Sequence, residues 1–122
     1  MARQNLDAAN WTQAYCTSHI GFCISIHRNW WFKSFGAAAP SLWHLEVSAA
    51  EINTMGDGPL SVDLLPGSVS AQSATDGEVR VSGDQVIGYK EWTENRHFEI
   101  RAPSALQAAV TYMVQHLTPM EE

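Results

Sequence analysis

The chain has 122 residues, of which 45% are hydrophobic, and a formal net charge of −6 at pH 7. This length predicts a single domain spanning residues 1–122, with enough apolar side chains to build a core without a structural metal. The seven lysine and arginine residues are scattered and form no basic stripe, so we expect no nucleic-acid partner.

The N-terminal segment, residues 1–18, is polar with a few aromatic side chains. Asp7 is a residue type that caps helices, and Trp11, Ala14 and Tyr15 follow at helical spacing. The spacing predicts a short N-terminal helix.

The most aromatic part of the chain is residues 21–36. Residues 20–27 alternate strictly between large apolar and small or polar side chains, which is typical of a strand with one buried face. Arg28 and Asn29 suit a tight turn, and residues 30–35 predict a second strand, so we expect an aromatic hairpin. Because Trp30 and Trp31 are consecutive, they must face opposite sides of that strand, and at least one should lie off the main core.

The rest of the chain predicts further strands and one helix. Alternating patterns predict strands over residues 42–47, 60–64, 78–82, 86–92 and 97–101. Residues 68–77 are mostly small and polar, and we expect an exposed loop there. Ser104 opens a Ser-x-x-Gln capping box, and apolar residues recur at helical spacing over residues 106–117.

This order of elements predicts the fold class. Strands do not alternate with helices, so the sheet should be mainly antiparallel. We expect an α+β domain with a sheet of about six or seven strands, a C-terminal amphipathic helix packed on one face, and the short N-terminal helix.

The same sequence bears on the location of the chain and on the state of its cysteines. No apolar run approaches the roughly 18 residues that a membrane-spanning helix needs. Polar residues follow Arg3 where a signal peptide would be apolar. We therefore expect no membrane span and a cytoplasmic location, unless a leader has been removed. Two cysteines in a chain of this length do not predict a disulfide scaffold, and their pairing stays open.

Cysteine and histidine residues occur close together near the aromatic stretch. Cys16, His19, Cys23 and His27 are all zinc-ligand types. On one strand, however, Cys23 and His27 would lie about 13 Å apart, which is too far for one tetrahedral ion. An activated Cys–His nucleophile would favour a glycine-rich elbow or a helix N-terminus directly after the cysteine. Neither cysteine is followed by such a feature. We predict no metal site and no cofactor.

Two strands carry titratable side chains on their predicted polar faces. His44 and Glu46 share one face of the first strand, and His97 and Glu99 share one face of the second. If these strands were neighbours, the four side chains could converge for general acid–base chemistry. We favour the alternative of a solvent-exposed polar face of a half-buried sheet, and predict no catalytic residue.

Residues 21–30 resemble the first hairpin of the Mog1/PsbP/DcrB-like fold group, whose members begin with Gly-Phe, an alternating strand, a short turn and then Trp. The ending is similar too, with a strand, a break at Pro103 and Ser104, and an amphipathic helix, so the likeness covers about half of the chain. The resemblance implies an antiparallel sheet between helices and a non-enzymatic accessory or binding role. It carries over no functional residue and names no partner.

The surplus of tryptophan is the main functional signal. Large aromatic side chains mark binding surfaces, and no phosphate loop, dinucleotide fingerprint or nucleophile elbow is present. We predict a non-catalytic module that binds a protein partner or a second copy of itself. The candidate binding residues are Trp30, Trp31, Trp43, His44, Trp92 and His97.

Two alternatives remain. The first is a small apolar ligand in a pocket between the sheet and the C-terminal helix, with His44 or His97 at the mouth. The second is an acid–base enzyme that uses the two His–Glu pairs.

Overall fold

The computed structural model describes residues 13–17, 20–27, 30–38, 41–48, 50–53, 58–70 and 74–119. The predictions that concern Asp7, Trp11, His19 and the turn at Arg28 and Asn29 lie outside these residues.

Strands dominate the described part of the chain, and one helix follows them. The strands are β1 (Gln13–Thr17), β2 (Phe22–Ile26), β3 (Trp31–Ala38), β4 (Ser41–Ser48), β5 (Leu60–Pro66), β6 (Val79–Ser82), β7 (Gln85–Trp92), β8 (Arg96–Pro103) and β9 (Thr118–Pro119). A 3-10 turn, η3 (Ser104–Leu106), leads into the helix α1 (Gln107–Gln115).

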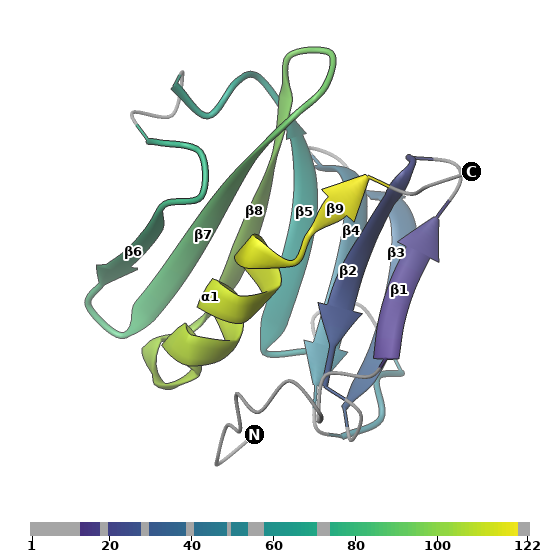
Figure 1. The fold of residues 1–122 in the computed structure, drawn as a ribbon. Helices are drawn as coiled ribbons and strands as arrows, with labels where there is room; N and C mark the ends of the chain where they lie inside the picture. Colours follow the sequence, from purple (N-terminus) through teal and green to yellow (C-terminus); the bar gives the residue numbers. More distant parts are fainter. Residues whose placement is uncertain are drawn as a thin grey trace.

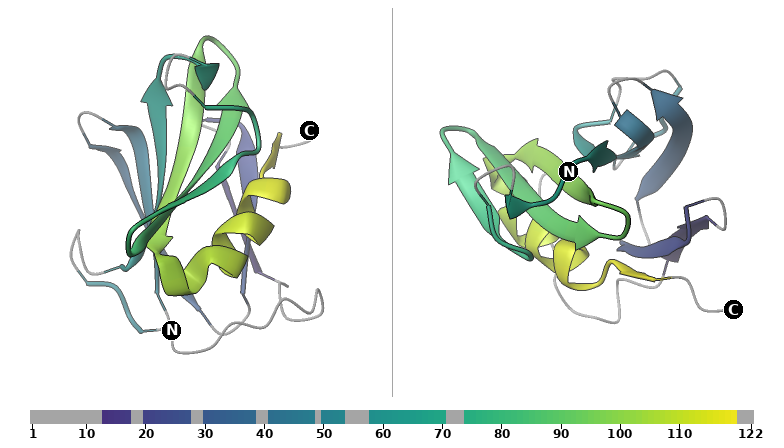
Figure 2. Two further views of the ribbon diagram at one scale, coloured as in Figure 1. Left: turned by 90° about the vertical axis from the view of Figure 1, so that its left-hand side faces the viewer. Right: turned by 90° about the horizontal axis from the view of Figure 1, so that it is seen from above.

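The strands form two antiparallel sheets. One has six strands in the order β3-β4-β5-β8-β7-β6, and the other has three in the order β1-β2-β9. In Figure 1, α1 and the three-stranded sheet lie together in front of the six-stranded sheet, and Figure 2 shows the two layers from the side. The predicted α+β class, with a mainly antiparallel sheet and a C-terminal helix packed on it, is therefore confirmed.

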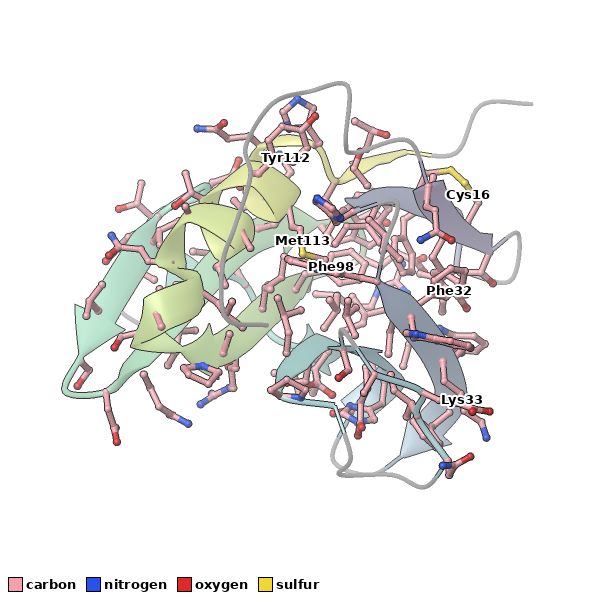
Figure 3. The ribbon with its side chains drawn as sticks, turned by 90° about the horizontal axis from the view of Figure 1, so that it is seen from below. Cys16, Phe32, Lys33, Phe98, Tyr112 and Met113 are labelled. Carbon is pink, nitrogen blue, oxygen red and sulfur yellow. A yellow bond between two sulfur atoms is a disulfide. The ribbon has the colours of Figure 1, made fainter. Side chains whose placement is uncertain are left out.

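The core lies between the two layers. The front layer contributes Phe22, Ile24 and Ile26 from β2 together with the apolar side of α1, and the six-stranded sheet contributes one face of β4, β5, β7 and β8. Figure 3 shows Met113 of α1 and Phe98 of β8 directed into this interior. Both side chains are almost fully buried.

The helix approaches the sheet most closely at Gly88 of β7. A Cβ atom added at Gly88 would lie 2.4 Å from Cγ2 of Val114 and 2.9 Å from Cγ1 of Val110. A side chain at this position would displace α1, so the absence of one allows the helix to lie flat on β7.

Among the described residues, the predicted N-terminal helix is not seen. Ala14 and Tyr15 of that predicted helix lie in β1, where Tyr15 pairs with Ile24 of β2. Three residues at helical spacing are too few to distinguish a helix from a short strand, and the pairing with β2 decides the conformation.

The predicted aromatic hairpin is wrong as well. Both strands exist, but β2 pairs with β1 and β9, whereas β3 pairs with β4. The chain therefore crosses from the front layer to the edge of the six-stranded sheet between Ile26 and Trp31. The alternation in β2 predicted its buried face correctly, since Phe22, Ile24 and Ile26 have no exposed surface.

A disulfide joins Cys16 of β1 to Cys23 of β2. The two residues are direct cross-strand partners, with their Cα atoms 4.1 Å apart. Their sulfur atoms are bonded to each other, so in this state neither is a thiolate for zinc binding or nucleophilic attack.

Candidate functional site

Polar side chains gather on the outer face of the six-stranded sheet, which is the face that turns away from α1. His44 of β4, Asp63 of β5 and Glu99 of β8 are successive cross-strand partners on this face. Strand parity also puts Glu46 and His97 here, each two residues from a member of that row.

This polar face is covered, and the prediction that it is solvent-exposed is wrong. Glu46, His97 and Glu99 are exposed by only 2%, 1% and 4%. The backbone of Gly58 approaches Glu46, and the carbonyl of Gly67 bonds to His97. The loops after β4 and β5 thus bury side chains that alternation alone would leave in water.

His44 lies between two carboxylates. Its Nδ1 is 2.6 Å from Oδ1 of Asp63, and its Nε2 is 2.6 Å from Oε2 of Glu46. Burial lowers the pKa of His44, but the hydrogen bonds to Glu46 and Asp63 outweigh it, so the pKa is raised above 6.5. With a carboxylate at each nitrogen, the ring is favoured as an imidazolium that donates two hydrogen bonds.

The two carboxylates beside His44 have further partners. The hydroxyl of Ser41 donates to Oδ1 of Asp63 at 2.7 Å, and the N–H of Gly58 donates to Oε1 of Glu46 at 2.8 Å. A Cβ atom at Gly58 would lie 2.7 Å from Cβ of Glu46, so this close approach depends on glycine.

His97 belongs to a second, deeper network. Its Nδ1 donates to the carbonyl of Gly67 at 2.8 Å, and its Nε2 is 2.8 Å from Oε2 of Glu99. The guanidinium of Arg101 bonds to the other oxygen of Glu99. Burial raises the pKa of Glu99, but the hydrogen bonds from His97 and Arg101 outweigh it, so the pKa is lowered and the carboxylate stays ionised.

Neither histidine in this arrangement has a ring nitrogen free to act as a general base. Both nitrogens of His44 are occupied by carboxylates, and His97 has almost no contact with solvent. A general base needs a free lone pair within reach of a substrate proton. The two histidines also lie on strands that β5 separates, so each forms a network with the glutamate of its own strand. The networks are suited to joining strands and loops.

The predicted aromatic residues separate into different environments. Trp30 is buried and stacks on His27 with ring centroids 5.1 Å apart, whereas Trp31 is 51% exposed. This confirms that the paired tryptophans face opposite sides. Trp43 is partly buried and donates its Nε1–H to the hydroxyl of Tyr15 at 3.0 Å. Of these three tryptophans, only Trp31 presents a large exposed surface.

Two exposed aromatic side chains lie at the start of β3, at one edge of the six-stranded sheet, whereas the exposed Val81 lies in β6 at the opposite edge. Trp31 and Phe32 of β3 are 51% and 37% exposed, and Leu42 of β4 is 40% exposed. Phe32 pairs with Val47 on the core side and has its ring 5.8 Å from that of Tyr15. Trp31 lies on the opposite face, so β3 presents an aromatic side chain on each side. Phe32 and Leu42 are not among the predicted binding residues, and only tertiary pairing identifies β3 as an edge strand.

Trp92, the remaining predicted tryptophan, lines a groove between the end of β7 and the end of α1. A ligand pocket was expected between the sheet and the helix, and this groove lies at the C-terminal end of the helix. His44 and His97 do not line it, because they lie on the opposite face of the six-stranded sheet.

In the part of the chain that the structure describes, no group of three or more His, Cys, Asp or Glu side chains is arranged to hold a metal ion. Within those same residues no helix is long and apolar enough to cross a membrane. Comparisons with protein-family models, with curated proteins and with solved structures found no match.

Proposed function

We propose that the chain is a non-catalytic binding module, and that β3 receives an extended segment of a protein partner as an added strand. The observation that carries this proposal is an eight-residue edge strand with an exposed aromatic side chain on each face. Added strands gain affinity from backbone hydrogen bonds and specificity from side chains on alternating faces.

The edge position of β3 supports the proposal. Among the described strands β3 pairs with β4 only, so its other backbone edge has no strand partner within that part of the chain. The opposite edge strand, β6, has four residues and is too short to offer a comparable template. Exposed edges are usually protected by charge or by a bulge.

Bulges in β3 are confined to its second half. Register shifts lie on both sides of Gly36, which has a φ of 67°. In the first half, Lys33 is the single charged residue. Its ammonium is 3.3 Å from the carbonyl oxygen of Asn53 and 5.7 Å from the centroid of the Phe35 ring. Figure 3 shows Phe32 and Lys33 on this strand at the periphery of the molecule. The segment around Trp31 and Phe32 is thus the open part of the edge.

Net charge indicates the chemistry of the partner. The chain carries −6 at pH 7, so long-range attraction favours a basic segment. We expect the bound segment to be extended, to carry lysine or arginine, and to contact Trp31 and Phe32.

A displayed library of random peptides tests this proposal. Selected peptides should protect the backbone amides of β3 from hydrogen exchange, and Trp31→Lys should weaken their binding at least tenfold. Val81→Lys is the matched control, because Val81 is 47% exposed on the opposite edge strand and its replacement should leave binding unchanged. Protection confined to other strands, or equal binding by the Trp31→Lys variant, would refute the proposal.

Self-association is a separate outcome of the same surface. If a second copy occupies β3, light scattering during size-exclusion chromatography will give a dimer mass that Trp31→Lys returns to a monomer. A strict monomer leaves the peptide as the occupant.

The disulfide also bears on location. The cytoplasmic location expected from the sequence remains a prediction, and a cross-strand disulfide argues against it, because such bonds persist in oxidising compartments. We propose that the chain works in an oxidising compartment. Thiol alkylation of protein taken from its natural source, without reductant, should modify neither Cys16 nor Cys23, and modification of both would contradict this.

A further inference from the structure

A groove of about 620 Å³ lies where the C-terminal end of α1 meets the end of β7. This volume falls within the range of roughly 300–1,000 Å³ that is typical of small-molecule sites. Three parts of the chain line it: the segment before β2, the end of β7, and the segment that joins α1 to β9. The lining residues that carry the argument are Ile20, Lys90, Trp92, Gln115 and Leu117.

The groove has a fixed apolar wall. The Trp92 ring packs at a steep angle against Phe22 and Phe98, with centroids 6.2 Å and 5.0 Å away. Leu117 is almost fully buried, and Ile20 is partly buried and packs against the core. These contacts hold an aromatic ring and two aliphatic groups in place before any ligand arrives, which reduces the entropic cost of binding.

Lys90 brings a positive charge to this wall. Lys90 and Trp92 lie on the face of β7 that turns toward α1, since Lys90 pairs with Phe98 of the core. Glu91 points to the other face, where its Oε1 accepts a hydrogen bond from the N–H of Val69 at 2.9 Å. Of the two charged residues that line the groove, only Lys90 therefore has its charge on the groove side.

The ammonium of Lys90 keeps donors available for a ligand. Its contact among the described residues is a loose ion pair, with Nζ 3.9 Å from Oδ1 of Asp76. That oxygen already accepts a hydrogen bond from the N–H of Glu91 at 2.9 Å. A lysine ammonium has three donors, so it can bind a carboxylate in the groove.

The partial negative charge at the C-terminal end of α1 is partly neutralised. Carbonyl oxygens at a helix C-terminus carry partial negative charge and would repel an anion. Here the N–H of His116 donates to the carbonyls of Tyr112 and Met113, at 3.1 Å and 3.2 Å. Nδ1 of His116 donates to Tyr112 as well, at 2.8 Å. These bonds reduce the negative potential beside the groove.

We propose that this groove binds a small amphipathic carboxylate, with its apolar tail against Trp92, Leu117 and Ile20 and its carboxylate on Lys90. The site is separate from β3, and its test does not depend on the function proposed there.

Titration with octanoate and with octanol, followed by NMR of backbone amides, tests whether the charge of Lys90 contributes to ligand binding. Octanoate should shift signals of residues 90–93 and 115–118 and bind more tightly than octanol. Lys90→Met keeps the length of the side chain and removes its charge, so it should weaken octanoate binding about tenfold to a hundredfold and leave octanol binding unchanged.

A pair of variants at the two ends of α1 tests where the ligand binds. Gln115→Trp places a large ring at the groove and should abolish the binding of both probes. Gln107→Trp makes the same change at the other end of α1, where it should have no effect. Equal affinities for octanoate and octanol, no binding of either, or unchanged binding by Gln115→Trp would each overturn the proposal.

Discussion

His44 is the residue whose surroundings depart most from what a strand position suggests. It is a polar residue on an alternating strand, yet it bonds to Glu46 of its own strand and to Asp63 of the next. One imidazolium between two carboxylates offsets a repulsion that would otherwise push β4 and β5 apart. Deeper in the same face, one carboxylate has two partners, since His97 and Arg101 bond to the two oxygens of Glu99.

The His44 contact predicts a pH dependence of stability. The pKa of His44 is raised in the folded state, so its contribution is fully present below its ordinary value of 6.5 and is lost as the pH rises through the folded-state pKa. We expect His44→Gln to lower the free energy of unfolding by about 2 kcal/mol at acidic pH and by less at alkaline pH. Urea denaturation of both proteins across this pH range measures the difference. A loss that is the same at every pH would contradict the charged state of His44.

For Glu99 we expect the opposite trend, a contribution to stability that is lost as the pH falls. Its pKa is lowered in the folded state, so its contribution is present above the ordinary value of 4.5 and is lost as the pH falls through the folded-state pKa. Arg101→Met removes one partner and should make the protein less stable at neutral pH, with a smaller loss in acid. The urea midpoint of the variant, measured against that of the wild type over this range, checks the prediction.

Two contacts between elements hold parts of this fold together, one between the two layers and one within the front layer. The first is the approach of α1 to Gly88 of β7, and the second is the disulfide that holds β1 against β2. Local sequence patterns predict the helix and the strands that these contacts join, but they do not predict the contacts.

Gly88→Ala should destabilise the protein by about 1–3 kcal/mol, because the new methyl group would overlap Val114 and Val110. Val114→Ala creates space at the same contact, and the double variant should lose less than the sum of the two single changes. A double-mutant cycle from urea denaturation measures this coupling. Strictly additive losses would show that α1 does not lie on Gly88.

Removal of the disulfide should cost about 2 kcal/mol, given the seven-residue separation of Cys16 and Cys23. We expect the double variant Cys16→Ser and Cys23→Ser to unfold at lower urea concentration than the oxidised wild type. Added reductant should bring the wild type to the stability of the variant, and should not change the variant. A wild type that is insensitive to reductant would argue against the bond.

At the scale of the whole molecule, both layers share one core. Residues of β2, of α1 and of the six-stranded sheet belong to a single buried cluster. We therefore expect one cooperative unfolding transition, with far-ultraviolet circular dichroism and tryptophan fluorescence giving the same midpoint. Two separate midpoints would show that the three-stranded sheet folds independently and would contradict a single domain.

Periodicity in the sequence was enough to predict most elements. The alternation of Phe22, Ile24 and Ile26 predicted a strand with one buried face, and the spacing over residues 106–117 predicted the C-terminal helix. The opposite orientation of Trp30 and Trp31 followed from adjacency alone. These features were predictable because the direction of a side chain is a local property of the backbone.

Tertiary structure alone decided which strands are neighbours and what covers them. No local pattern indicates that β2 and β3 belong to different sheets, that Cys16 faces Cys23, or that loops bury Glu46 and His97. Pairing and burial depend on contacts between residues far apart in the chain, which alternation does not encode. The aromatic stretch was therefore recognised from the sequence, whereas the exposure of Trp31 and Phe32 at an open edge and the groove beside Trp92 emerged only from the packing of the two layers.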